Sequence, residues 1–214
     1  MKAVILAAGR GTRLQPLTNT VPKCLVQVHG KSMLQYQLES LASAGVHECI
    51  IVVGYLGGQV KREIGTKFGP VHITYITNEV FGSTNNIYSL WLASEQLCDD
   101  ILLIEGDLIF DPLLLWDLSL SHHSDLAVVD TFKPSMDGTV ILPEGSFAKS
   151  MILKSQQPDE FQYEHALKTV NIYSFCQQTM EKQFLPVIDD FVAQGFINEF
   201  YEAAIAELVA HQNL

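Results

Sequence analysis

The chain has 214 residues, 48% of them hydrophobic, and a formal net charge of −11 at pH 7. This size and apolar content exclude a disordered chain and suit one α/β domain with a sizeable core. So acidic a chain does not bind nucleic acid through a broad basic surface, and no apolar run reaches the length of a membrane span. We therefore expect neither a nucleic-acid partner nor a membrane partner.

The four cysteines are widely spaced and form no C-x-x-C pair: Cys24, Cys49, Cys98 and Cys176. This usage favours buried free thiols in a reducing compartment, and the apolar N-terminus is too short for a signal peptide. We therefore expect a cytoplasmic protein. Residues 1–214 read as a single domain, which is also compatible with one part of a longer, multifunctional chain.

The first apolar run, residues 2–6, predicts a buried strand that leads at once into a glycine-containing loop. Small residues and two glycines between Ala7 and Arg13 let the backbone approach a ligand and point its N–H groups at phosphate oxygens. Arg13 and Lys23 add positive charge on either side of a proline-containing segment, residues 16–22. Together these features indicate a triphosphate cradle. The loop lacks the P-loop sequence and the third glycine of the dinucleotide fingerprint, which excludes both of those cradles.

Helices and strands alternate through the next part of the chain. Apolar spacing predicts a helix over 32–44, with Ser32 as N-cap and Gly45 just beyond its end. Further helices are expected over 57–68 and 85–97, and buried strands over 49–53, 71–76 and 100–105. Strands separated by helices imply a parallel sheet covered on both faces.

Asp107 follows the strand that ends at Glu105. Open parallel sheets bind ligands at the carboxyl ends of their strands, so Asp107 is the first candidate for a Mg²⁺ ligand. Glu105 and Asp111 are weaker alternatives. The adjacent His122 and His123 point to opposite sides of any strand, which favours a solvated loop over a metal site.

The last third of the chain predicts a smaller, antiparallel section followed by helices. Strands are expected over 125–129, 140–142, 147–153 and 168–175. Residues 177–195 are expected to be helical with an interruption near Pro186, and the last helix is expected to open at residue 196.

The segment from Leu6 to Leu25 resembles a family signature, LAAGxGxRLxPLTxxxPKxL. This is the signature of the nucleotidyltransferases that activate sugar phosphates and small alcohol phosphates, and the resemblance extends more weakly over nearly the whole chain. It implies a three-layer, mostly parallel, Rossmann-like sheet with a small antiparallel section on the acceptor side. It also implies a Mg²⁺ cofactor.

The resemblance assigns roles to individual residues. Arg13 and Lys23 would contact phosphates, and Lys168 would reach the phosphate of the acceptor. Glu202 occupies the place of the family's second metal-binding acid, which is an aspartate in many relatives. The expected nucleotide site comprises Leu6, Ala7, Ala8, Gly9, Gly11, Thr12, Arg13, Lys23, Asn78, Gly82, Ser83, Asn85 and Gly106. The expected acceptor site comprises Asn86, Tyr88, Asp137, Lys168, Asn171, Glu199 and Tyr201.

Two shorter stretches point to one branch of the family. Residues 85–90, NNIYSL, are similar to the NNxYSL stretch of bacterial phosphocholine and aminoalkylphosphonate cytidylyltransferases, and the KTxNxY pattern from Lys168 favours the phosphonate branch. The resemblance implies CTP and a small phosphonate or phosphate acceptor, with 2-aminoethylphosphonate preferred. Phosphocholine, a sugar 1-phosphate and a non-catalytic nucleotide-binding role are the alternatives, and a homodimer is compatible with the sequence.

Overall fold

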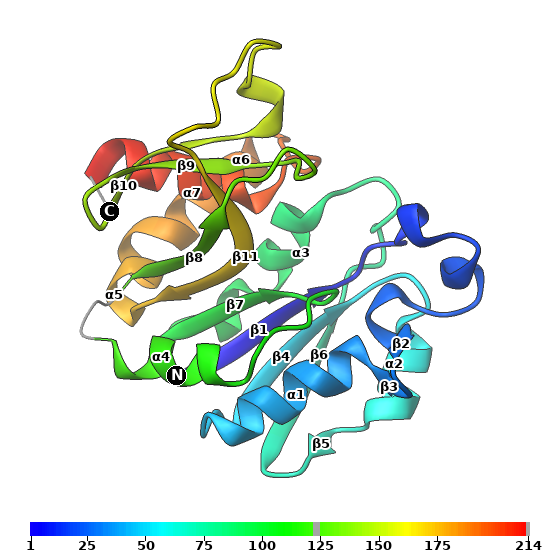
Figure 1. Cartoon of the computed structure of the whole chain (residues 1–214). Coiled ribbons are helices and arrows are strands. Elements are labelled where there is room, and N and C mark those ends of the chain that lie inside the picture. The colour runs from blue at the N-terminus through cyan, green and yellow to red at the C-terminus, as the bar shows by residue number, and fades with distance from the viewer. Residues whose placement is uncertain (122–124, 213–214) are drawn as a thin grey trace.

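The structure is a computed structural model that describes residues 1–121 and 125–212. The prediction for His122 and His123 therefore lies outside the described residues. Within the described part of the chain, nine strands form one sheet in the order β10-β9-β11-β7-β1-β4-β6-β5, and β8 pairs with β11 (Figure 1). The short strands β2 (Gln27–Val28) and β3 (Lys31–Ser32) pair separately.

Four central strands are parallel: β1 (Lys2–Ala7), β4 (Glu48–Val53), β6 (Val71–Thr77) and β7 (Ile101–Glu105). The others are antiparallel to their neighbours: β5 (Lys67–Phe68), β8 (Leu126–Thr131), β9 (Val140–Glu144), β10 (Phe147–Ile152) and β11 (Leu167–Phe175). The structure thus confirms a mostly parallel sheet that continues into an antiparallel section.

Strand β1 lies in the middle of the sheet and divides its side chains between two cores. Val4 and Leu6 pack into one cluster, whereas Ala3 and Ile5 pack into the other. This alternation is the two-residue period of a strand, and burial on both faces explains why the strand is apolar throughout.

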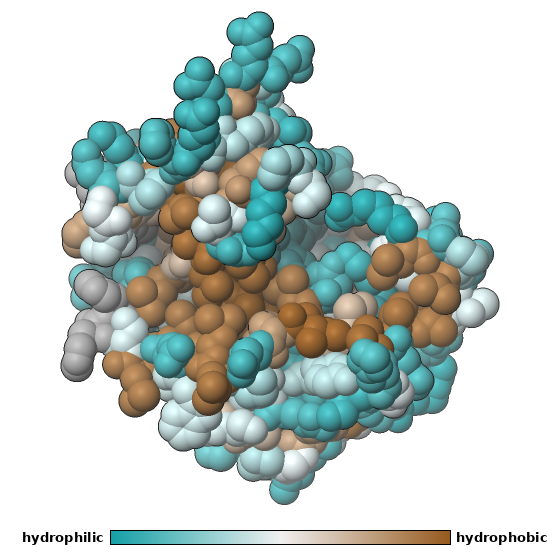
Figure 2. Space-filling model, viewed as in Figure 1, coloured by the Kyte–Doolittle hydropathy of each residue, from teal (hydrophilic) through white to brown (hydrophobic). Residues whose placement is uncertain are grey.

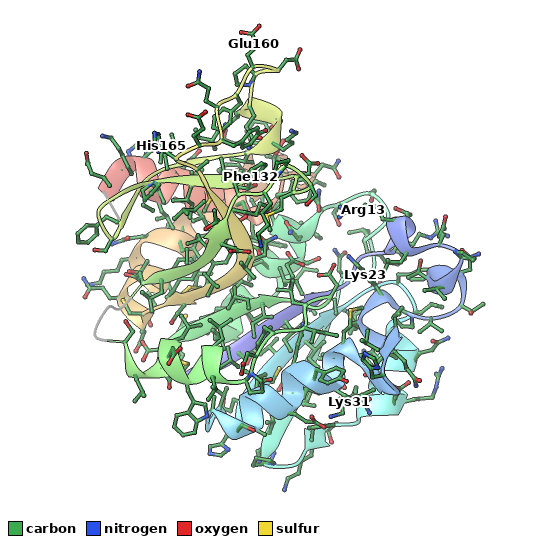
Figure 3. The ribbon with its side chains drawn as sticks, in the orientation of Figure 1. Arg13, Lys23, Lys31, Phe132, Glu160 and His165 are labelled. Carbon is green, nitrogen blue, oxygen red and sulfur yellow. The ribbon has the colours of Figure 1, made fainter. Side chains whose placement is uncertain are left out.

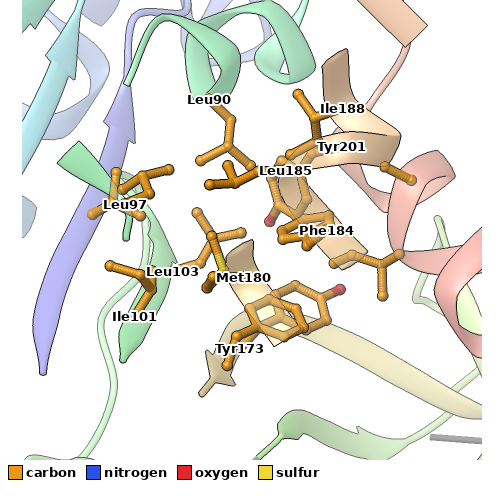
Figure 4. Close-up of a cluster of buried hydrophobic side chains, with 14 of the residues drawn as sticks. Leu90, Leu97, Ile101, Leu103, Tyr173, Met180, Phe184, Leu185, Ile188 and Tyr201 are labelled. Atoms are coloured by element: carbon orange, nitrogen blue, oxygen red, sulfur yellow. The ribbon is translucent and has the colours of Figure 1, made fainter. Parts of the chain in front are cut away.

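Helices cover both faces of the sheet and complete the three layers. The first cluster packs under α3 (Asn86–Leu92), α6 (Leu185–Ala193) and α7 (Tyr201–Gln212), as Figure 4 shows for its central side chains. The second cluster packs under α1 (Met33–Ser43), α2 (Gly57–Ile64) and α4 (Leu113–Leu120). On α4 three large apolar residues, Leu113, Trp116 and Leu120, are exposed, and Figure 2 shows apolar atoms over this region of the surface.

The ends of α1 agree with the sequence prediction. Ser32 Oγ accepts a hydrogen bond from the backbone N–H of Gln35, and Gln35 Oε1 accepts one from the N–H of Ser32. This capping box satisfies two N–H groups that the first turn leaves without partners. Gly45 follows the helix with φ +75°, the left-handed conformation that glycine favours.

Three expectations require correction. Helix α2 stops at Ile64, because Gly65 turns the chain into β5, which pairs with β6. Helix α3 ends at Leu92 and a 3₁₀ turn follows. The last helix begins at Tyr201 and not at residue 196. By contrast, residues 177–193 are helical as expected, and the interruption expected near Pro186 takes the form of a π-helix over Met180–Phe184, directly before α6.

The cysteines also differ in part from expectation. All four are free, but only Cys24 and Cys49 are buried, and Cys98 is exposed on the surface. Within the described residues, no helix has both the length and the apolar character needed to cross a lipid bilayer.

Candidate active site

A cavity of about 1020 Å³ opens where the parallel strands end. The loop after β1 forms one side of it, and the antiparallel strands together with the start of α7 form the other. Figure 3 shows Arg13 and Lys23 on the loop side, away from the long excursion that carries Glu160. The lining residues that the sequence predicted are Leu6, Ala7, Ala8, Gly9, Gly11, Thr12, Arg13, Lys23, Asn78, Asn85, Asn86, Gly106, Asp107, Asp137, Lys168, Asn171, Glu199 and Glu202.

The loop after β1 folds back against Lys23. Gly11 has φ +65°, and a Cβ at this position would lie 2.9 Å from the Lys23 Cβ. The hydroxyl of Thr18 donates a hydrogen bond of 2.7 Å to the Gly11 carbonyl and closes the loop on itself. A glycine is needed here both for the backbone conformation and for the close approach.

Lys23 forms an ion pair with Asp107, its Nζ donating to Oδ2. Burial lowers the pKa of Lys23, and the nearby charge of Arg13 lowers it further, whereas Glu105 raises it. Gly106, which lies between Glu105 and Asp107, donates its N–H to the Leu6 carbonyl at 2.9 Å and so ties the end of β7 to β1.

Two acids lie together in the cavity wall, the half-buried Glu105 and the buried Glu202. Burial raises the pKa of Glu105 to about 7, and the charge of Glu202 contributes to that rise. Glu202 is only 6% exposed, and burial likewise raises its pKa, an effect that Lys168 opposes. Asn86 Nδ2 donates a hydrogen bond of 2.9 Å to Glu105 Oε1.

The acids can be tested against the requirements of Mg²⁺. Among the described residues, no group of three or more His, Cys, Asp and Glu side chains gathers as a metal site. In phosphoryl-transfer sites Mg²⁺ usually takes one or two carboxylates and completes its shell with phosphate oxygens and water. Asp107 and Glu202 line the same cavity and supply two carboxylates, and a cation beside the buried Glu202 would favour its charged form. This donor set fits Mg²⁺ bound together with a triphosphate.

Hydrogen bonds hold Lys168 on the cavity wall that the antiparallel strands form, opposite the loop after β1. Its Nζ donates to the Thr139 carbonyl at 3.2 Å, the Thr169 carbonyl at 2.8 Å and the Thr169 hydroxyl at 3.0 Å. Burial lowers the pKa of Lys168, while Glu202 and Asp137 raise it. These hydrogen bonds fix the ammonium group in position on this wall of the cavity.

Lys154 is a lining residue that the sequence prediction missed. Its Nζ lies 3.1 Å from Asp137 Oδ1, and this interaction lowers the pKa of Asp137. The hairpin of β9 and β10 brings Asp137 and Lys154 together from either side, and no local motif signals that pairing. The other lining residues that were missed are Cys24, Gly138, Thr139, Leu153, Ser155 and Asn198. Phe81, Thr84, Ser89 and Phe200 also line the cavity, as does Glu105, which had been a weaker metal candidate.

Four predicted residues do not line the cavity. Tyr201 is fully buried and packs edge to face against Tyr173, with ring centroids 5.9 Å apart, so the expectation of acceptor contact is corrected to a role in the core. Tyr88 stacks on Trp91 at 5.3 Å outside the cavity. Gly82 and Ser83 lie in the turn behind the wall, where the Ser83 hydroxyl bonds to the Val80 carbonyl.

Asn78 lines the cavity, but its side-chain amide already forms hydrogen bonds within the protein. The amide nitrogen donates to the Thr84 and Ser89 hydroxyls, both at 3.0 Å, and the amide oxygen accepts from the Val80 N–H. Its buried amide therefore shapes the loop between β6 and α3, where the sequence had predicted a contact with the base.

Comparison with known proteins decides the family. Residues 2–129 match the family model "Nucleotidyl transferase". The chain belongs to the nucleotidyl transferase family. The parallel strands β1, β4, β6 and β7 and the Arg13–Lys23 loop fall inside the matched region, whereas Lys168 and Glu202 follow it.

Relatives within the nucleotidyl transferase family include enzymes named for CTP chemistry. The chain is 30% identical over 211 residues to CMP-5′-(3-aminopropyl)phosphonate synthase of Streptomyces rubellomurinus, covering 98% of this chain and 34% of that protein. It is 40% identical over 123 residues to the choline-phosphate cytidylyltransferase of Streptococcus pneumoniae, covering 58% of this chain and 52% of the relative. The chain thus spans about a third to a half of the length of these two relatives.

Solved structures agree with the fold. CTP:phosphocholine cytidylyltransferase from Streptococcus pneumoniae superposes with a TM-score of 0.77 at 28% identity, over 100% of this chain and 87% of that one. A UDP-glucose pyrophosphorylase complexed with UDP-glucose superposes with a TM-score of 0.78 at 16% identity, over 100% of this chain and 88% of that one, which shows the shared fold alone.

Proposed function

We propose that this chain is a cytidylyltransferase that joins CMP from CTP to a small amino-alkyl phosphonate or phosphate and releases pyrophosphate, with Mg²⁺ as cofactor. One observation carries the proposal: the phosphate-binding loop, the acids Asp107 and Glu202 and the acceptor-side lysines Lys154 and Lys168 all line a single cavity. The names of the Streptomyces and Streptococcus relatives support cytosine and a small acceptor.

The reaction is an in-line displacement at phosphorus. An oxygen of the acceptor's phosphonate or phosphate attacks the α-phosphorus of CTP, and the bond to the bridging oxygen of the β-phosphate breaks. The acceptor is largely ionised near neutral pH, because the second pKa of a phosphate group is about 6, so no general base is needed. Catalysis then depends on positioning and on neutralising charge.

The charged residues divide this task between them. Arg13 and Lys23 balance the charge on the departing pyrophosphate, and Lys168, assisted by Lys154, orients the acceptor anion. A bound Mg²⁺, held by Asp107 and Glu202, would neutralise the α-phosphate and the incoming oxygen.

Two carboxylates that line the cavity would meet the acceptor's amine: Glu199, and Asp137, which also pairs with Lys154. A primary ammonium suits such acids, and this favours 2-aminoethylphosphonate. Phosphocholine is the second candidate, because the rings of Phe81 and Phe200 also line the cavity and aromatic faces bind quaternary ammonium groups. A cytoplasmic location and a homodimer stay predictions.

Pyrophosphate release tests the proposal. Each of CTP, UTP, dTTP, ATP and GTP is paired with 2-aminoethylphosphonate, phosphocholine, phosphoethanolamine and glucose 1-phosphate in the presence of Mg²⁺. We expect turnover with CTP and one amino acceptor, reduced at least about 100-fold in Asp107→Ala because a metal ligand is lost. Asp117→Ala is the matched control, since Asp117 is an exposed acid on α4 that lies outside the cavity. Turnover with glucose 1-phosphate alone would overturn the proposed acceptor class.

A further inference from the structure

Asn86 connects two elements that are far apart in the chain. Its Nδ2 donates to Glu105 Oε1 at the end of β7, and its Oδ1 accepts from the Tyr201 backbone N–H at the start of α7, both at 2.9 Å. Both polar ends of this one amide therefore contact the protein. The resemblance had instead assigned Asn86 to the acceptor.

The two partners of Asn86 adjoin the two candidate metal ligands. Glu105 precedes Asp107 by two residues, and Tyr201 directly precedes Glu202. The Tyr201 N–H lies in the first turn of α7, where the helix supplies no carbonyl partner. Asn86 thus satisfies that N–H from another element and fixes where α7 begins.

Asn85 reinforces the same connection. Its backbone N–H donates to the Ile197 carbonyl at 2.9 Å, and its side-chain nitrogen donates to the Asn198 carbonyl at 3.2 Å. We call Asn85 and Asn86 the asparagine clamp. The clamp holds the segment before α7 against the N-terminus of α3.

We propose that Asn86 is a positioning residue that sets the separation of the Asp107 and Glu202 carboxylates and hence the affinity of the site for a divalent cation. This inference rests on the proposed function for the identity of the two ligands. Residues that orient metal ligands typically change metal affinity or activity 10- to 100-fold when they are removed. A residue that contacts the acceptor directly would change acceptor binding instead.

The test compares Asn86→Ala with Asn86→Leu, in which the side chain keeps nearly the same volume but makes neither hydrogen bond. Gln96→Ala is the control, because Gln96 is an exposed residue that lies beyond α3 and outside the cavity. Three quantities are measured for each variant: amide hydrogen exchange at Tyr201, the dissociation constant of Mn²⁺ in the presence of α,β-methylene CTP, and the acceptor KM.

We expect both Asn86 variants to speed exchange at Tyr201 and to weaken Mn²⁺ binding about 10- to 100-fold, with the acceptor KM unchanged. A raised acceptor KM with unchanged Mn²⁺ affinity would overturn the proposal, and so would faster exchange at Tyr201 without weaker Mn²⁺ binding. Should the alanine variant fail to fold, the leucine variant carries the comparison. If the wild-type chain released no pyrophosphate, the proposed function would fail, but Tyr201 exchange and Mn²⁺ affinity would still report on the clamp.

Discussion

The residues around Glu105 change the pKa of its carboxyl group. Burial and the charge of Glu202 raise its pKa to about 7, although Asn86 and Lys23 oppose the rise. The folded protein therefore binds a proton at Glu105 more tightly than the unfolded chain, in which the pKa is about 4.5. The contribution of Glu105 to stability should fall as pH rises from about 4.5 to about 7, because only the unfolded chain releases this proton freely in that interval.

We expect Glu105→Gln to reduce this loss of stability, since glutamine does not titrate. The free energy of unfolding, measured by urea titration without metal at pH 5 and at pH 7.5, should fall less in the variant. The fall in the wild type should exceed the fall in the variant by at most about 3 kcal/mol, because the pKa of Glu105 is raised by about 2.5 units. Glu95→Gln, at an exposed acid, is the control. Equal falls in the wild type and in Glu105→Gln would contradict the burial argument.

Gly11 allows a second comparison at the scale of one residue. Gly11 and Gly30 both have positive φ, but a Cβ at Gly11 would meet the Lys23 side chain, whereas one at Gly30 meets nothing within 4 Å. We expect Gly30→Ala to cost about 1 kcal/mol of stability for its backbone conformation alone. Gly11→Ala should cost more and also raise the KM for CTP, because Lys23 must move. Equal stabilities of the two variants would show that crowding at Lys23 is unimportant.

Some cavity residues could be predicted from the sequence because their signals are local. Arg13 and Lys23 belong to one continuous motif, and Asp107 follows directly after a buried strand. The positions of Lys154 and Tyr201 could not be predicted in this way, because neither has a local signal. Lys154 reaches the cavity only through hairpin pairing. Periodicity alone could not tell which of the neighbours Tyr201 and Glu202 lines the cavity and which lies in the core.

At the scale of elements, most of the loop over residues 8–23 is exposed. Its outer part is held to the rest of the chain by exposed side chains, since the Tyr55 hydroxyl donates to the Asn19 carbonyl and the Gln59 amide to the Thr20 carbonyl. We expect its amides to exchange quickly without nucleotide and more slowly with saturating CTP and Mg²⁺, because phosphate oxygens then accept from its N–H groups. Hydrogen exchange measured by mass spectrometry decides this, and α1 serves as an internal control. Unchanged exchange in the loop would argue against its role as a phosphate cradle.

The element boundaries show which interactions sequence reasoning can capture. The ends of α1 were predicted because its capping box and Gly45 lie within the helix or next to it. The ends of α2 and α7 were wrong, because β5 is stabilised by pairing with β6, and the start of α7 is set by Asn86 across more than a hundred residues. Such long-range partners leave no local pattern.

On the scale of the whole molecule, the parallel part of the sheet was easier to predict than its antiparallel part. Alternating strands and helices imply the parallel part, whereas β11 must pair with β9 at its first residues, with β7 at its last and with β8 at both ends. Its register with β8 shifts between Thr169 and Tyr173, around Asn171 with φ +62°. Asn171 thereby reaches the cavity wall, although the apolar alternation of the strand predicted no irregularity there.

The distribution of the site along the chain has a consequence for synthesis on the ribosome. The proposed phosphate-binding loop follows β1, whereas Glu202 follows every strand of the sheet and emerges only after them. A nascent chain therefore acquires the loop well before Glu202, the second of the two proposed metal ligands. We expect ribosome-stalled chains that expose the sheet but not α7 to retain CTP without turning it over. Turnover should begin once a stalled chain is long enough for α7 to dock, and earlier release of pyrophosphate would show that Glu202 is dispensable.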